Sequence, residues 1–160
     1  MSAMQGNSIA IVAAAAEKIR SRDTHYPYKQ ATNLSYLCGF SEPESVLVLI
    51  PGRGQGESIL FCREKNKLRE TWDGYRTGPE GAVADFAVDD AFPIGDLDDI
   101  LPGLLEDKER VYYAIGKDAD FDRHLMGWVS EISGSAAPGE FVDLDHIVNE
   151  MRLIKTAAEL

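Results

Sequence analysis

The sequence predicts an α/β domain built on a mixed β-sheet flanked by helices, and three observations favour that fold class. An uninterrupted aliphatic run at 46–50 lies between a turn with Pro43 and a Pro-Gly stop at 51–52. A run this short is typical of a strand covered on both faces. Short apolar runs then alternate with stretches of helical spacing. The length of 160 residues, 44% of them hydrophobic, suits one domain, which we expect to cover residues 1–160.

The segment ahead of the central run predicts one strand and an extended connection. Residues 8–14 are apolar and contain two isoleucines and a valine, so we expect the first strand there, although alanine-rich segments also form helices. Pro27 excludes Tyr26 from helical conformations, which favours an extended connection over 25–30.

A short helix and a hairpin are expected around the central run. Residues 33–38 predict one or two helical turns, with Thr32 or Asn33 as N-cap and Gly39 as the end. Residues 57–63 form a second apolar run behind a glycine-rich connection, which is a hairpin signal.

The remainder alternates helix and strand. We expect helices at 79–86, 97–105, 118–132 and 144–160 and strands at 91–94 and 110–115. Pro102 is expected to interrupt or bend its helix. The apolar residues of 118–132, Met126 and Trp128 among them, recur at helical spacing and are assigned to the core.

The net charge of −11 is concentrated in one segment. Residues 80–122 contain 13 acidic and 3 basic side chains. Such a surface repels phosphate backbones, so we expect no nucleic-acid partner. The segment is interpreted as a solvated face, with attraction of a cationic ligand, such as a peptide amino terminus, as the alternative.

The cysteines and the N-terminal segment indicate the compartment. Cys38 and Cys62 have no second Cys or His at metal-ligand spacing, which favours reduced, partly buried thiols. Residues 1–7 carry no basic side chain, and the apolar stretch 9–16 is followed by Glu17 and a lysine. That pattern fits neither a signal peptide nor a membrane span, so we expect a cytoplasmic protein with no membrane contact.

Candidate catalytic groups are scattered. His25, His124 and His146 are far apart in the sequence, and Asp23 with His25 would supply only two metal ligands. Metal-assisted hydrolysis needs a cluster of such ligands with an open position. We therefore expect no catalytic residue, no metal site and no cofactor in this chain, and no enzymatic activity from it alone.

Residues 63–81 contain two further features. Arg63, Lys65, Lys67 and Arg69 alternate as the chain leaves the second strand, which indicates a solvated edge. Residues 70–81 are expected to form a glycine-rich loop. Its tryptophan, tyrosine and arginine fit either a loop anchored in its own core or an exposed recognition loop.

Four blocks of the sequence carry a family resemblance. They are Arg-Ser-Arg-Asp-Thr-His-Tyr-Pro-Tyr-Lys-Gln at 20–30, Tyr-Leu-Cys-Gly-Phe-Ser-Glu-Pro-Glu at 36–44, Glu-Thr-Trp-Asp-Gly-Tyr-Arg-Thr-Gly at 70–78 and Asn-Glu-Met-Arg-Leu-Ile-Lys at 149–155. In this order they resemble the N-terminal domain of bacterial Xaa-Pro aminopeptidase (aminopeptidase P), a member of the creatinase, prolidase and methionine-aminopeptidase clan.

This resemblance implies a parent enzyme. It implies a "pita-bread" catalytic domain beyond residue 160, holding two divalent metals, usually manganese, and releasing the N-terminal residue that precedes proline in a peptide. It also implies a homodimer or tetramer. Ahead of the first strand the family carries an amphipathic helix, where this sequence has only about seven residues.

The resemblance also implies site residues. Trp72, in the pattern Trp-x-Gly-x-Arg that ends at Arg76, is expected near the mouth of the active site of a neighbouring subunit. Asp23, in the block that contains Tyr26, is expected at the same rim. These four residues are the predicted substrate-access residues. Three alternatives remain open: the N-terminal domain of a prolidase, that of a creatinase, or a free-standing binding or assembly module.

Overall fold

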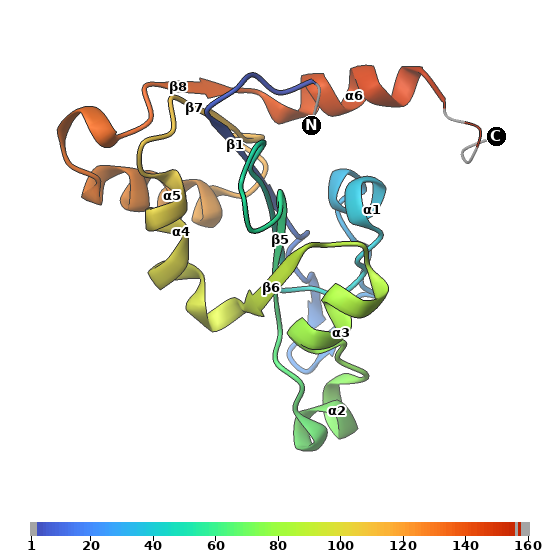
Figure 1. Ribbon diagram of the computed structural model, residues 1–160. Coiled ribbons are helices and arrows are strands. Elements are labelled where there is room, and N and C mark those ends of the chain that lie inside the picture. Colours follow the sequence, from blue (N-terminus) through green and yellow to red (C-terminus); the bar gives the residue numbers. More distant parts are fainter. Residues whose placement is uncertain (1–2, 156, 158–160) are drawn as a thin grey trace.

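The computed structural model describes residues 3–155 and 157. Within them, six strands form one mixed sheet in the order β6-β5-β4-β1-β7-β8, with helices on both faces (Figure 1). The strands are β1 (Ser8–Ala13), β4 (Val46–Leu49), β5 (Ser58–Cys62), β6 (Asp90–Pro93), β7 (Arg110–Tyr112) and β8 (Glu140–Val142). The predicted fold class is confirmed.

Strand β4 lies at the centre of the sheet, as predicted. It pairs antiparallel with β1 and with β5, placing Val48 opposite Ile59. Because side chains alternate along a strand, Val46 and Val48 enter the core on one face and Leu47 the core on the other, and all three are buried. The outer pairs β1–β7, β5–β6 and β7–β8 are parallel.

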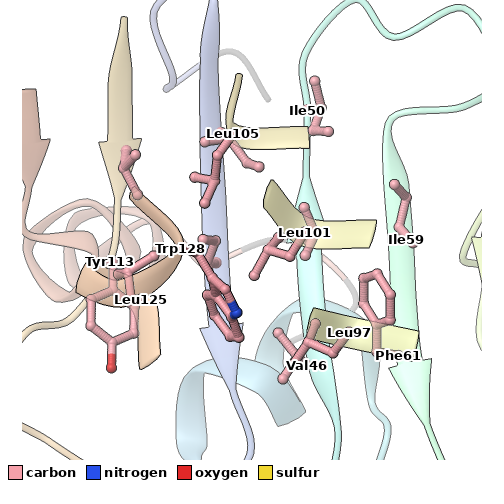
Figure 2. Close-up of a cluster of buried hydrophobic side chains, with 14 residues drawn as sticks. Val46, Ile50, Ile59, Phe61, Leu97, Leu101, Leu105, Tyr113, Leu125 and Trp128 are labelled. Carbon is pink, nitrogen blue, oxygen red and sulfur yellow. The ribbon is translucent and has the colours of Figure 1, made fainter. Parts of the chain in front are cut away.

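One face of the sheet is covered by α4 (Leu97–Leu105) and α5 (Ala119–Glu131). Leucines at 97, 101 and 105 lie along one side of α4 and pack on the strands (Figure 2). Trp128 of α5 packs into the same cluster, and its indole N–H donates to Asp98 Oδ1 at 3.0 Å. Helix α4 continues through Pro102, so the predicted interruption is wrong, while the alternative of a bend stays a prediction.

The opposite face is covered by α1 (Thr32–Cys38), α3 (Gly78–Asp85) and α6 (Leu144–Leu153). Leu34, Ala82 and Val148, one from each helix, are buried against it. The mixed sheet is therefore packed from both sides, which is why its central strands are almost wholly apolar.

The ends of several elements differ from the predictions. Helix α1 has Ala31 at its N-cap and no side-chain cap, because alanine carries no acceptor. The Ala31 N–H itself donates to Gln30 Oε1 at 2.8 Å. Its C-cap is Gly39 with φ 72°, as expected. Helix α6 ends at Leu153, short of the predicted residue 160, and the predicted residues 156 and 158–160 lie outside the described part of the chain.

Three short strands were not predicted, and one was predicted too long. Strands β2 (Ile19–Ser21) and β3 (Thr24–His25) form a separate hairpin just ahead of the predicted extended connection. Strand β8 lies within a stretch assigned to no element. Strand β7 ends at Tyr112 rather than Ile115, where the Ile115 N–H turns back to the Tyr113 carbonyl at 3.2 Å.

Candidate functional site

The segment between β5 and α3 projects from the body of the molecule. It holds α2 (Lys67–Asp73), which lies beyond α3 at the lower end of the view in Figure 1. We call residues 65–77 the arm. The side chain of Asn66 accepts the N–H groups of Leu68 and Arg69, so this residue caps the helix. Within the predicted loop at 70–81, the non-helical part is therefore limited to residues 74–77.

The arm exposes its large apolar side chains. Trp72 is 88% exposed, Leu68 82% and Tyr75 69%, and α2 buries none of its residues. The alternative that this segment is anchored in its own core by Trp72 is therefore wrong. Exposure of this much aromatic and aliphatic surface on one short projection is a feature of interaction sites.

Lys65 closes the arm on itself. Its ammonium group donates to the Arg76 carbonyl at 2.9 Å, pairs with Glu70 at 3.3 Å and lies 4.0 Å from the centre of the Tyr75 ring. Glu70 also accepts the Arg76 N–H at 2.8 Å, and this bond holds the pKa of Glu70 below its usual value. These contacts join the start of the arm to its end without any help from the core.

Arg76, one of the predicted substrate-access residues, is only 8% exposed. Its guanidinium pairs with Asp73 at 3.3 Å, and its Nε has no hydrogen-bond partner among the described residues. Arg76 thus lies inside the base of the arm, whereas Trp72 lies on its outer surface.

The carboxylate of Glu42 binds Thr77, the last residue of the arm. It accepts the Thr77 N–H at 2.7 Å and the Thr77 hydroxyl, and it pairs with Arg63 at 3.3 Å. The side chains of Glu42 and Arg63 are only 12% and 10% exposed. The expectation of a solvated edge is therefore wrong for Arg63. Its guanidinium is buried because it pairs with the carboxylate of Glu42, and the sequence pattern gave no sign that these two residues are neighbours.

The other two predicted residues lie on the β2–β3 hairpin. Asp23 is exposed in the turn between the strands. Tyr26 follows β3, is 53% exposed and has the Arg20 guanidinium 5.9 Å from its ring centre. The structure therefore distributes the four predicted residues over two segments, the hairpin and the arm, and leaves three of them exposed.

A hydrogen-bond hub connects the hairpin side to the sheet. Gln30 Oε1 accepts from the N–H groups of Ala15 and Ala31 and from the Tyr28 hydroxyl, and Gln30 Nε2 donates to the Glu42 carbonyl at 2.8 Å. Burial, with a smaller contribution from Glu17, raises the pKa of Tyr28 to about 12. The sequence offered no reason to predict these roles, because Gln30 meets Ala15 and Glu42, and Glu42 meets Arg63 and Thr77, only in the folded chain.

The described residues hold no group of three or more His, Cys, Asp or Glu side chains placed to bind a metal. His25 lies 3.9 Å from Glu17, His124 stacks on Trp128, and His146 pairs with Glu150 at 3.3 Å, so the histidines serve three separate places. The residues present do not fit the pair of metals that the resemblance implies. No helix in the described part of the chain is long and apolar enough to span a bilayer.

Comparison with known families identifies the domain. The profile described as aminopeptidase P, N-terminal domain, matches residues 1–112. The chain belongs to the aminopeptidase P N-terminal domain family. The Xaa-Pro aminopeptidase of Escherichia coli K12 is 36% identical over 98% of this chain and 37% of its own length.

Solved structures of aminopeptidase P share the fold. The Pseudomonas aeruginosa aminopeptidase PepP has a TM-score of 0.92 and 53% identity, covering 96% of this chain and 36% of that one. Zinc-substituted E. coli aminopeptidase P in complex with product has a TM-score of 0.90 and 36% identity over 96% of this chain and 36% of its own. The chain thus spans about a third of the length of these relatives.

Proposed function

We propose that this aminopeptidase P N-terminal domain shapes substrate access in a proline-specific metallo-aminopeptidase, which releases the first residue of Xaa-Pro peptides. The observation that carries the proposal is the arm, on which Trp72 is 88% exposed. The two ends of the arm are held together by the contacts of Lys65 with Arg76 and Glu70. An indole offers a flat apolar surface on which a proline ring can pack, and its N–H remains available to a polar partner.

The chemistry belongs to a catalytic domain that follows this one. The two divalent metals, usually manganese, would there activate water for attack on the peptide bond. No step is assigned to residues of this chain, because its described side chains do not gather into a ligand set. We infer a cytoplasmic setting from the free thiols of Cys38 and Cys62.

Assembly is part of the same proposal. The arm extends away from its own sheet (Figure 1), so its exposed apolar side chains are available to a second subunit. We propose a homodimer or tetramer in which Trp72 lies at the rim of a neighbour's active site. Light scattering of the protein with its catalytic domain should give a mass of two or four subunits at micromolar concentration. A monomer would contradict this assembly.

Substitution of Trp72 tests the access role. In the protein with its catalytic domain, Trp72→Ala should weaken the binding of longer proline-containing peptides by roughly 1 to 2 kcal/mol, because packing on the indole is lost. Steady-state kinetics with a peptide length series measures this. The control is Ile115→Ala, which removes an apolar side chain that is 57% exposed outside the arm and should leave the series unchanged. Equal kinetics for Trp72→Ala and the parent would overturn the role.

A further inference from the structure

We propose that Glu42 is a positioning residue that holds the arm in one orientation relative to the sheet and the β2–β3 hairpin. The inference rests on the proposed function, because it explains how an arm whose helix buries no residue can present Trp72 at a fixed place. It assigns to the buried carboxylate a role in substrate access without any contact with substrate.

The arm needs an anchor because packing does not supply one. Helix α2 has no buried residue, and a helix of its length is marginal in water by itself. The contacts of Lys65 make the arm a closed unit, but they lie within the arm and do not fix its direction. Orientation must come from the two points at which the chain enters and leaves it.

The two ends of the arm meet at one place. A Cβ added to Gly78, which has φ 72°, would lie 3.3 Å from the Lys65 Cβ and 3.4 Å from its backbone nitrogen. Glycine is therefore needed there both for the positive φ and for this close approach. Thr77, the last residue of the arm, stands next to this contact and is the residue that Glu42 binds.

Glu42 connects this point to the sheet. Its Oε1 accepts hydrogen bonds from both the backbone N–H and the hydroxyl of Thr77, and its Oε2 accepts one from the guanidinium of Arg63, the residue that follows β5. Hydrogen bonds to an ionised acceptor in a buried setting are stronger than neutral ones. One side chain thus joins the exit of the arm to the strand from which the arm departs.

The backbone of Glu42 extends the connection to the hairpin. Its carbonyl accepts from Gln30 Nε2 at 2.8 Å and from the Ser45 hydroxyl at 3.0 Å. Gln30 in turn binds the backbone beyond β1 and the hydroxyl of Tyr28, two residues after Tyr26. Thr77 and the hairpin exit are therefore fixed to the same residue, and this brings both segments with predicted rim residues under one constraint.

Hydrogen exchange on this chain tests the anchor directly. Glu42→Gln keeps the shape but removes the charge, and Thr77→Val keeps the shape but removes the hydroxyl. Both should speed exchange of the Arg76 and Thr77 amides, by about tenfold or more for Glu42→Gln, because a charge-assisted bond is lost. Amides of β4 and β5 should keep their protection, since they belong to the sheet.

Two controls separate this effect from general loosening. Thr77→Ser retains the hydroxyl and should keep the slow exchange of the arm. Asp90→Asn weakens a comparable ion pair, that of Arg53 with Asp90 at 3.4 Å, and should leave the arm unchanged. Unaltered exchange of the arm in both Glu42→Gln and Thr77→Val would overturn the proposal.

Kinetics of the protein with its catalytic domain tell the two proposals apart. Glu42→Gln should reduce kcat/KM for longer peptides in the manner of Trp72→Ala, and the double variant should lose no more than Trp72→Ala alone. If Trp72→Ala lowers kcat/KM and Glu42→Gln does not, the positioning role fails while the access role stands. If Glu42→Gln loosens the arm but Trp72→Ala leaves the kinetics intact, the anchor stands and the access role fails.

Discussion

Trp72 and Trp128, the two tryptophans of the chain, occupy opposite environments. Trp72 is 88% exposed on the arm, whereas Trp128 is 6% exposed and its indole N–H is bound to Asp98. A side chain contributes to folding according to the surface that it removes from water, so chemical identity does not predict the contribution. These two residues therefore form a matched pair within one chain.

We expect Trp72→Ala to change the free energy of unfolding by no more than about 0.5 kcal/mol, as for other surface positions. Trp128→Ala should cost about 3 to 5 kcal/mol, because it leaves a cavity in the core. Urea denaturation of the two variants measures both. A large loss for Trp72→Ala would show that the arm is packed in solution and would remove the basis for its role in access.

Asp89 gives the stability of the chain a dependence on pH. Its carboxylate accepts the N–H groups of Glu57 and Ser58, at 2.8 and 3.0 Å, and the Ser58 hydroxyl. These bonds, above all those from Ser58, hold the pKa of Asp89 below its usual value. A carboxyl whose pKa is lowered by folding stabilises the protein above its unfolded pKa, and this contribution disappears as the pH falls through the folded value.

Asp89→Asn should therefore reduce stability at pH 7 and reduce its decline below about pH 4, since the unfolded pKa of an aspartate is near 3.9. Urea denaturation midpoints of the variant and the parent at pH 7 and pH 3 measure how much stability each protein loses on acidification. Equal acid sensitivity of the variant and the parent would show that other carboxyls account for the decline.

At the scale of elements, the β4–β5 hairpin depends on a close approach. Gly56 in its turn has φ 116°, and an added Cβ would lie 2.3 Å from the Cβ of Asp89. Gly54 in the same turn has open space around it and no positive φ. Gly52 also has a positive φ, of 78°, so two of the three glycines in the predicted connection adopt a conformation that favours glycine, and Gly54 does not.

Gly56→Ala should destabilise the chain by more than about 1 kcal/mol, because alanine is strained at this φ and collides with Asp89. Gly54→Ala should be neutral or slightly stabilising. Thermal or urea unfolding of the pair measures the difference. Equal stabilities would mean that the turn relaxes and that Asp89 does not clamp it.

At the scale of the whole molecule, this chain should release no amino acid from an Xaa-Pro peptide when manganese is added. The reason is that its described His, Asp and Glu side chains do not gather into a ligand set. An amino-acid release assay on the pure chain, with the two-domain protein as positive control, measures this. Saturable turnover that a chelator abolishes would contradict the proposal that the metal chemistry belongs to a separate catalytic domain.

Much of the architecture was predictable because local physics determines it. The aliphatic run at 46–50 is too short for a buried helix and is bounded by turn residues, the connection after it is rich in glycine, and α5 has helical spacing of its apolar residues. Gly39 ends α1 as expected, since the C-cap needs a positive φ. The four sequence blocks were sufficient to indicate the family, which the comparisons then showed.

The sequence by itself determined the fold class, the central strand and the family, because hydrophobic spacing and local motifs are written along the chain. Only the tertiary structure decided that Trp72 is exposed, that Arg63 and Arg76 are buried and that Glu42 joins the arm to the sheet. These facts depend on pairs such as Glu42 and Thr77, which are 35 positions apart. Such contacts exist only once the sheet has brought its strands together, and no local pattern encodes them.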